Sequence, residues 1–424
     1  MSAPAQSRSE FRLGGKALAA ALLGVTCGAS PLPFNVLPLV MGPIRAEFGW
    51  SFASISAGMT IFGIIASVMS PIYGAAADKF GVRPVALSSL LAFGVVFAGF
   101  WFLPSSLMGY YLFWFVLGLV SIGSTPVTWS RAISMWFLKN RGLALGIMLL
   151  GTSLAGMTVP RIAQAIISEA GWRAAFPALA LLPIFLALPV GLAWFREPRP
   201  DERPPGVSDA NGNLIGLTLG QAVRGYRFWV FCASIAAVAF GYAGAHVHMS
   251  QIVQLHGFSA ETSAAVMGVV AAGILVSRLV VGFLFDRFWA PGIALPALLL
   301  PALACYFLMG SAPSLPTVMI GAFLLGFAAG TESDMIAFLT ARYFGMAHYG
   351  RIYGVFYMPF GIFSAISPLV YGAVRDATGN YDTILMASLC LFVISAALLL
   401  MLGRYPVLAT ATARSKGAAA PSVT

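Results

Sequence analysis

Long apolar stretches recur along this chain of 424 residues, each about as long as the roughly 20 residues that a helix needs to cross a bilayer. Hydrophobic residues make up 59% of the chain and charged residues 9%, with a mean hydropathy of +0.88, which leaves too little polar surface for a water-soluble domain. We therefore expect an all-α, polytopic membrane protein with about twelve transmembrane helices. The stretches lie near residues 17–40, 53–75, 84–103, 108–131, 142–166, 174–195, 226–250, 260–284, 291–311, 314–340, 352–374 and 383–403.

A polar segment that contains several prolines divides these stretches into two sets of six. We expect an N-terminal six-helix bundle over residues 1–195, a linker over 196–224, a C-terminal six-helix bundle over 225–404 and a disordered tail over 405–424. The residues before about Leu13 are rich in Ala, Ser and Pro and are also expected to be disordered.

The net charge of +10 is spread in short groups between the apolar stretches and forms no patch that would suit nucleic acid. With the N-terminus inside, the basic residues collect in the loops on the same side as the linker, which predicts cytoplasmic termini and a cytoplasmic linker. We expect a multi-pass protein of the bacterial inner membrane. These loop residues are Lys79, Arg83, Lys139, Arg141, Arg196, Arg199, Arg203, Arg224, Arg227, Arg287, Arg342 and Arg351.

A short pattern of glycine, aspartate and a basic residue occurs twice, each time at the end of an even-numbered apolar stretch. The two copies are separated by 208 positions, which predicts two halves with the same fold. The first copy consists of Gly74, Asp78 and Lys79, and the second of Gly282, Asp286 and Arg287.

The first copy resembles the loop motif of the major facilitator superfamily, matched here by Gly74, Asp78, Lys79, Gly81 and Arg83. The resemblance implies two pseudo-symmetric six-helix bundles that move against each other around one site near the middle of the membrane. It also implies a gating role for both copies, in which the glycines allow close helix packing and the charged residues cluster where the bundles part and rejoin.

Within that superfamily, the chain looks most like the monocarboxylate and oxalate/formate transporter branch, which implies small organic acids as substrates. That branch often has an Asp one turn before an Arg in helix 8, whereas this chain has Ile274 one turn before Arg278. The resemblance is carried by Phe48-Gly49-Trp50-Ser51, by Arg141-Gly142-Leu143-Ala144-Leu145-Gly146, by Gly171-Trp172-Arg173, and by Arg278, Gly282, Asp286 and Arg287 in their order.

Arg278 is the strongest candidate for substrate binding. It lies eight residues before Asp286, which places it about 12 Å along the helix from that end, where its guanidinium cannot easily reach either surface. A cation on a spanning helix costs about 2.5–3.5 kcal/mol, and the equivalent position in the first half is Ser70, so the fold itself does not require an arginine. We expect a bidentate clamp for a carboxylate, with neutralisation by a neighbouring group as the alternative.

Glu332 and Asp334 are candidates for proton coupling, because they are acidic residues within a predicted span. Two residues apart on a helix, they point about 200° from each other, so only one is expected to face a central cavity. The alternative is that they pair with Arg131 or Arg342 and lock a closed state.

His248, near the outer end of helix 7, resembles a histidine found in bacterial members of this branch and is a candidate for substrate binding or proton relay. A capping or interfacial role is the alternative, and we expect His246, His256 and His348 to be interfacial.

Further candidates for contact with substrate are aromatic and amide residues on helices that line the cavity in the resembling fold. Packing against lipid or against other side chains is the alternative for each, and Arg161 offers either a second anion contact or an outward-directed cation. These candidates are Asn35, Trp129, Tyr357 and Phe360.

The sequence therefore predicts a secondary active transporter that moves a small organic carboxylate by alternating access, as a proton symporter. We expect a monomer in the lipid bilayer, with the organic acid and protons as partners. We expect no cofactor, no metal and no enzymatic activity, because phosphate-binding, metal-ligand and nucleophile motifs are missing from the sequence. Carboxylate exchange or antiport, efflux of hydrophobic drugs, and a receptor that senses a solute without moving it are the alternatives.

Overall fold

The computed structural model describes residues 10–209, 211–310 and 313–408. Its regular structure is helical, apart from two isolated β-bridges, which confirms the expected all-α fold. Eleven helical segments are long and apolar enough to cross a membrane among the described residues. The N-terminal half contains α1 (Glu10–Thr26), α2 (Leu32–Phe48), α3 (Phe52–Phe80), α4 (Val82–Gly99), α5 (Leu107–Ser121), α6 (Pro126–Trp136), α7 (Arg141–Ala170), α8 (Trp172–Leu181) and α9 (Leu188–Trp194). The C-terminal half contains α11 (Tyr226–Leu255), α12 (Ala260–Arg287), α13 (Ala290–Leu308), α14 (Leu315–Leu339), α15 (Tyr349–Thr378) and α16 (Asp382–Leu400), and α10 (Leu219–Val223) precedes it.

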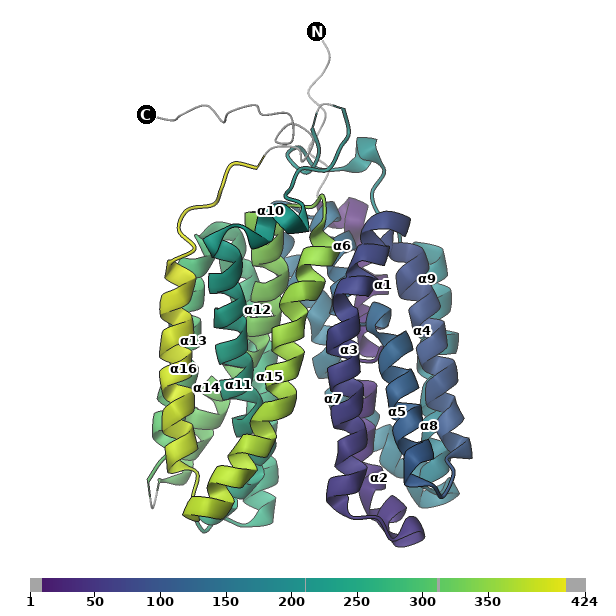
Figure 1. Ribbon diagram of the computed structural model, residues 1–424, viewed down its shortest axis with the longest axis vertical. Helices are drawn as coiled ribbons and strands as arrows, with labels where there is room; N and C mark the ends of the chain where they lie inside the picture. Colours follow the sequence, from purple (N-terminus) through teal and green to yellow (C-terminus); the bar gives the residue numbers. More distant parts are fainter. Residues whose placement is uncertain (1–9, 210, 311–312, 409–424) are drawn as a thin grey trace.

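These helices form two bundles that stand side by side, with the linker and α10 at one end (Figure 1). The bundles contact each other mainly through α3 against α15 and through α7 against α12. At the linker end the ribbons of α3 and α15 lie close together, and they diverge toward the opposite end (Figure 1). The fold is therefore the expected pair of six-helix bundles, closed at the linker end.

The first spanning helix is not continuous, so the expectation of one helix over residues 17–40 was wrong. It consists of α1 at the linker end and α2 at the opposite end, separated by residues 27–31 (Figure 1). Pro31 and Pro33 lack a backbone N–H, which interrupts the helical hydrogen bonds at this point. The break packs against another interruption, because the Ala29 N–H donates to the Ser124 Oγ (3.2 Å) and a Cβ at Gly28 would meet the carbonyl of Ser124.

Two further spans are interrupted part-way by local departures from the α-helix. The fourth span is divided between α5 and α6 by a 3₁₀ turn at Ile122–Ser124, just before Pro126 at the start of α6. The sixth span contains a π-helical segment, Leu182–Ala187, between α8 and α9. Such irregular backbone in a membrane protein is tolerated where neighbouring helices provide partners for the freed groups.

The ends of the chain differ in part from the expectation. Residues 10–12 belong to α1, so the expectation of disorder before Leu13 was wrong for them, whereas residues 1–9 and 409–424 lie outside the described part of the chain. In the linker, Arg196 forms an ion pair with Glu202 (2.5 Å), and this contact lowers the pKa of Glu202 to about 2.

Candidate functional site

Glycines bring the backbones of the two bundles into direct contact at the linker end. A Cβ at Gly74 of α3 would overlap the carbonyl of Gly350 in α15, and a Cβ at Gly142 of α7 would overlap the carbonyl of Gly282 in α12. Gly350 and Gly142 are themselves 208 positions apart, like the two copies of the motif. Both interfaces are thus copies of one arrangement, and each depends on the lack of a side chain.

The two motif aspartates reach across this interface to the N-terminus of a helix in the other bundle. Asp78 accepts hydrogen bonds from the backbone N–H groups of Gly350 (2.9 Å) and Arg351 (2.8 Å) at the start of α15. Asp286 accepts from the N–H groups of Gly142 (2.6 Å) and Leu143 (2.9 Å) at the start of α7. A carboxylate at a helix N-terminus satisfies free N–H groups and interacts favourably with the helix dipole, so both contacts join the two bundles at the linker end.

The ion-pair partner of Asp78 lies outside the motif. Arg131 of α6 lies 2.9 Å from Asp78 through its Nε and also pairs with Glu197, which follows α9.

The other motif residues make contacts within the N-terminal bundle. Lys79 lies over the ring of Phe80, and Arg83 donates to the carbonyl of Leu192. Gly81 joins α3 to α4 with a φ of 86°, a conformation that favours glycine.

Arg278 lies in the interior of the protein and is 5% exposed. Its Nη1 lies 3.3 Å from Asp334 Oδ1 in α14, and its Nη2 donates to the hydroxyl of Thr152 in α7 (3.1 Å). The arginine thus contacts both bundles. Its Nε and the Oδ2 of Asp334 are buried and have no hydrogen-bond partner among the described residues. In this conformation the guanidinium is neutralised by Asp334 and retains an unused donor.

Glu332 is also buried, at 1% exposure, but it forms no ion pair within the described residues. Its Oε1 has no hydrogen-bond partner there. Tyr242 of α11 lies within electrostatic range of both Glu332 and Arg278. The two acidic residues of α14 therefore differ in environment, since Asp334 has a cationic partner and Glu332 has none among the described residues.

His248 is bound within the C-terminal bundle through both ring nitrogens. Nε2 lies 2.9 Å from the Pro368 carbonyl, and Nδ1 lies 2.9 Å from the Tyr381 hydroxyl and 3.0 Å from Gln251 Oε1. His246 points away from this network, because two residues along a helix correspond to about 200° of rotation. Its ring stacks on Tyr242 with a centroid distance of 5.2 Å.

The remaining candidates are divided between the bundles. Asn35 donates to the Pro31 carbonyl (2.8 Å) and lies near Gly156 of α7, whereas Trp129 is fully buried between Gly24 and Phe195. In α15, the ring of Tyr357 stacks on Tyr353 and contacts Phe360, with centroid distances of 6.4 Å and 5.2 Å.

The sequence did not single out Thr152, Tyr242 and Tyr353, although the structure places all three near Arg278. The sequence offered one signal, and only for Thr152. This residue lies on α7, the helix that packs against α12 and thus against the helix of Arg278. Threonine and tyrosine are too common in membrane helices to be informative alone.

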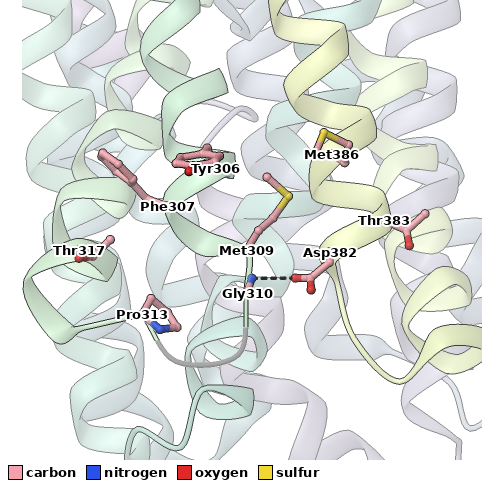
Figure 2. A pocket seen from close by; sticks show the side chains of 9 residues that line it. All are labelled: Tyr306, Phe307, Met309, Gly310, Pro313, Thr317, Asp382, Thr383 and Met386. Carbon is pink, nitrogen blue, oxygen red and sulfur yellow. Dashed lines mark hydrogen bonds between the residues drawn. The ribbon is translucent and has the colours of Figure 1, made fainter.

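A separate cavity of about 780 Å³ lies between the end of α13 and the start of α16. Figure 2 shows its lining, in which the Gly310 N–H donates to Asp382 Oδ1 (3.2 Å). None of the site residues considered above lines it. No group of three or more His, Cys, Asp or Glu side chains gathers as a possible metal site in the described part of the chain.

Comparison with known proteins identifies the family. Residues 23–368 match the model of the Major Facilitator Superfamily. The mouse protein Monocarboxylate transporter 11 is 27% identical over 337 residues, which cover 74% of this chain and 70% of the mouse protein. A probable sulfoacetate transporter of Cupriavidus necator is 25% identical over 373 residues, which cover 81% of this chain and 84% of that protein.

Solved structures show the same fold at low sequence identity. The human organic anion transporter MFSD10 has a TM-score of 0.71 and 17% identity, with 93% of this chain and 100% of that chain covered. The fucose:proton symporter of E. coli has a TM-score of 0.70 and 13% identity, with coverage of 94% and 100%. The chain is therefore a multi-pass membrane protein for solute transport, and it belongs to the major facilitator superfamily.

Proposed function

We propose that this protein is a proton-coupled symporter that moves a small organic monocarboxylate into the cytoplasm by alternating access. The observation that carries the proposal is the buried contact of Arg278 with Asp334 and Thr152, where a cation, an acid and the second bundle meet. The relatives named as monocarboxylate and sulfoacetate transporters support an anionic organic substrate.

Arg278 suits a carboxylate because the planar guanidinium can donate two parallel hydrogen bonds to its two oxygens. Only Nη1 and Nη2 are engaged in this conformation, whereas Nε is free. The cost of burying Arg278 is then offset by Asp334 in the empty carrier and by the substrate in the loaded one.

Proton coupling follows from competition between two carboxylates for one arginine. While Asp334 is ionised it occupies Arg278, and once Asp334 takes up a proton it releases the guanidinium to the substrate. Asp334 thereby supplies, from α14, the acid that the resembling branch often carries at the position of Ile274. One proton and one monocarboxylate would then move together with no net charge.

The contacts of Asp78 and Asp286 supply the inner gate of this cycle. We place the linker end in the cytoplasm, in keeping with the basic residues of its loops, so the conformation described here is closed to the cytoplasm. Opening inward requires both carboxylates to leave the helix N-termini that they bind, while the bundles rock around the Arg278 site.

Uptake of labelled monocarboxylates into proteoliposomes under an imposed pH gradient tests the proposal. We expect accumulation that is driven by an acidic exterior and lost in Arg278→Ala. Arg375→Ala, which removes an exposed arginine from the outer end of α15, is the matched control and should transport normally. Uptake that ignores the gradient, or that is unchanged in Arg278→Ala, would reject the proposal. Counterflow into preloaded vesicles separates symport from exchange, and binding without flux would indicate a receptor.

A further inference from the structure

The two helices that receive the gate carboxylates do not cap their own N-termini. Asn140 precedes α7 and His348 precedes α15, and neither side chain forms a capping hydrogen bond. A carboxylate from the other bundle can bind two N–H groups at once only if the first turn holds a fixed orientation. The residues just before each helix therefore determine whether the gate can close.

Glu10 of α1 holds the segment that precedes α7. Its Oε1 accepts hydrogen bonds from the N–H groups of Leu138 and Lys139, and its Oε2 accepts from the N–H and the Nδ2 of Asn140, all at 3.0 Å. Two residues beyond Asn140, the N–H groups of Gly142 and Leu143 donate to Asp286. Two carboxylates thus bind the start of α7. Glu10 of the same bundle binds residues 138–140, and Asp286 of the other bundle binds residues 142–143.

The linker holds the equivalent segment before α15. The N–H of Met346 donates to the Ile215 carbonyl (2.7 Å), and the N–H of Leu217 donates to the Phe344 carbonyl (2.8 Å), as Gly216 lies against Gly345. Leu138 and Met346 are 208 positions apart, so the same N–H of the repeat is bound in both halves. A side-chain carboxylate binds it in the first half, and the linker backbone binds it in the second.

We propose that Glu10 and the linker segment 215–217 are paired positioning elements of the inner gate, each of which orients the helix N-terminus that a gate aspartate of the other bundle must bind. This inference rests on the alternating access of the proposed function. Each element stays with the helix that it orients, because Glu10 lies in the bundle of α7 and the linker segment is hydrogen-bonded to the start of α15. Both can therefore keep the helix ends ready to bind again after the bundles separate.

The two halves differ in the element that supplies the acceptors. In the first half they are the two carboxylate oxygens of Glu10, which belongs to α1. In the second half the linker joins the two bundles, and its contact with residues 344–346 connects the position of the linker to the start of α15. A change in the linker would thus be transmitted to the contact between Asp78 and Gly350.

Cysteine labelling at the inner gate tests the proposal without any substrate. Ser130, which is fully buried and 3.1 Å from the Tyr349 hydroxyl across the interface, is replaced by cysteine in a protein whose four native cysteines are changed to serine. The rate of labelling by a membrane-impermeant maleimide then reports opening at the linker end. We expect Glu10→Ala to raise this rate by about three- to tenfold, since tenfold corresponds to about 1.4 kcal/mol in the opening equilibrium.

Two further variants and two controls keep the result interpretable. Gly216→Val should also raise the labelling rate, because a Cβ at Gly216 would press on Phe344 O and Ala347 N. Glu169→Ala, an exposed acid at the other end of α7, and Gly220→Ala, whose Cβ would meet nothing within 4 Å, should leave the rate unchanged. Glu10→Gln should give an intermediate rate, because an amide keeps one of the two acceptor oxygens.

The outcome is compared with the thermal unfolding of each variant. A merely structural role for Glu10 would lower the unfolding temperature without raising the labelling rate of the folded protein. Rates in Glu10→Ala and Gly216→Val that match those of Glu169→Ala and Gly220→Ala would overturn the proposal. If Glu10→Ala does not fold, Glu10→Gln and Gly216→Val decide the matter. A wrong assignment of substrate leaves this experiment readable, because it measures gate opening alone.

Discussion

Arg278 and Asp334 lie 56 positions apart in the sequence, yet their charged groups meet 3.3 Å apart between α12 and α14. Both are almost fully buried, and a Cβ at Gly146 of α7 would touch the backbone of the arginine and the second oxygen of the aspartate. The pair is therefore enclosed by both bundles. Its environment leads to separate expectations for stability and for transport.

Removing one member of the pair should cost more stability than removing both. In Arg278→Met the carboxylate of Asp334 loses its only ion-pair partner among the described residues, and breaking a buried pair in this way costs about 3–5 kcal/mol. The double variant Arg278→Met/Asp334→Asn leaves no uncompensated charge and should unfold close to the wild-type temperature. Thermal unfolding of the purified proteins measures both. A double variant that is less stable than Arg278→Met would contradict this account.

Asp334→Asn should remove the pH dependence of substrate affinity. In the wild type, acid protonates Asp334 and frees Arg278, so KM for the carboxylate should fall as the pH is lowered and rise as Asp334 ionises. Asparagine imitates the protonated acid at every pH, so KM in the variant should be low and flat, and accumulation driven by a pH gradient should be lost. Initial uptake rates measured over a series of pH values test this. If the variant keeps the wild-type pH profile, proton coupling depends on another group, and Glu332 is then the next candidate.

Gly146→Ala should disturb the interface between the bundles. The added Cβ would overlap the carbonyl of Arg278, and such overpacking typically costs about 1–3 kcal/mol. We expect a lower unfolding temperature and a reduced rate of uptake. Gly268→Ala on α12 is the matched control, because a Cβ there meets nothing within 4 Å. Equal effects of the two substitutions would show that helix propensity, and not the interface, is responsible.

His248→Ala should affect stability more than substrate binding. The ring bridges α11 to the Pro368 carbonyl of α15 and to Tyr381, which immediately precedes α16, so its loss removes hydrogen bonds that join these helices, each worth about 0.5–1.5 kcal/mol. KM for the substrate should stay within about twofold of the wild type. His256→Ala provides a comparison at the outer end of the same bundle. An increase of KM by tenfold or more in His248→Ala alone would contradict this expectation and support the sequence-based prediction that this histidine binds substrate.

The spanning helices could be predicted from the sequence because a bilayer imposes one length on every apolar stretch. The interruption at residues 27–31 could not, since Cys, Gly and Ala continue the apolar pattern and Pro31 alone is compatible with a helix start. Which groups replace the missing helical hydrogen bonds depends on Ser124, almost a hundred positions away.

A site residue could be predicted from the sequence only where burying its side chain in the membrane costs free energy. Arg278 was identified because a buried cation needs a compensating partner. The sequence left either of two acids or a substrate as that partner, and the packing of α12 against α14 identifies Asp334. The directions in which the two histidines of α11 point could not be predicted, because this helix is apolar on most sides. The sequence could not fix the rotation of α11, and the structure turns His248 toward its own bundle and His246 toward Tyr242.

The crossed contacts at the linker end also bear on the origin of the chain. Each half supplies one aspartate and one helix N-terminus, so that Asp78 binds α15 and Asp286 binds α7. A reciprocal exchange of identical contacts is what a twofold-symmetric dimer interface requires. Two copies of one six-helix ancestor could therefore have formed both contacts before duplication and fusion joined them into a single polypeptide.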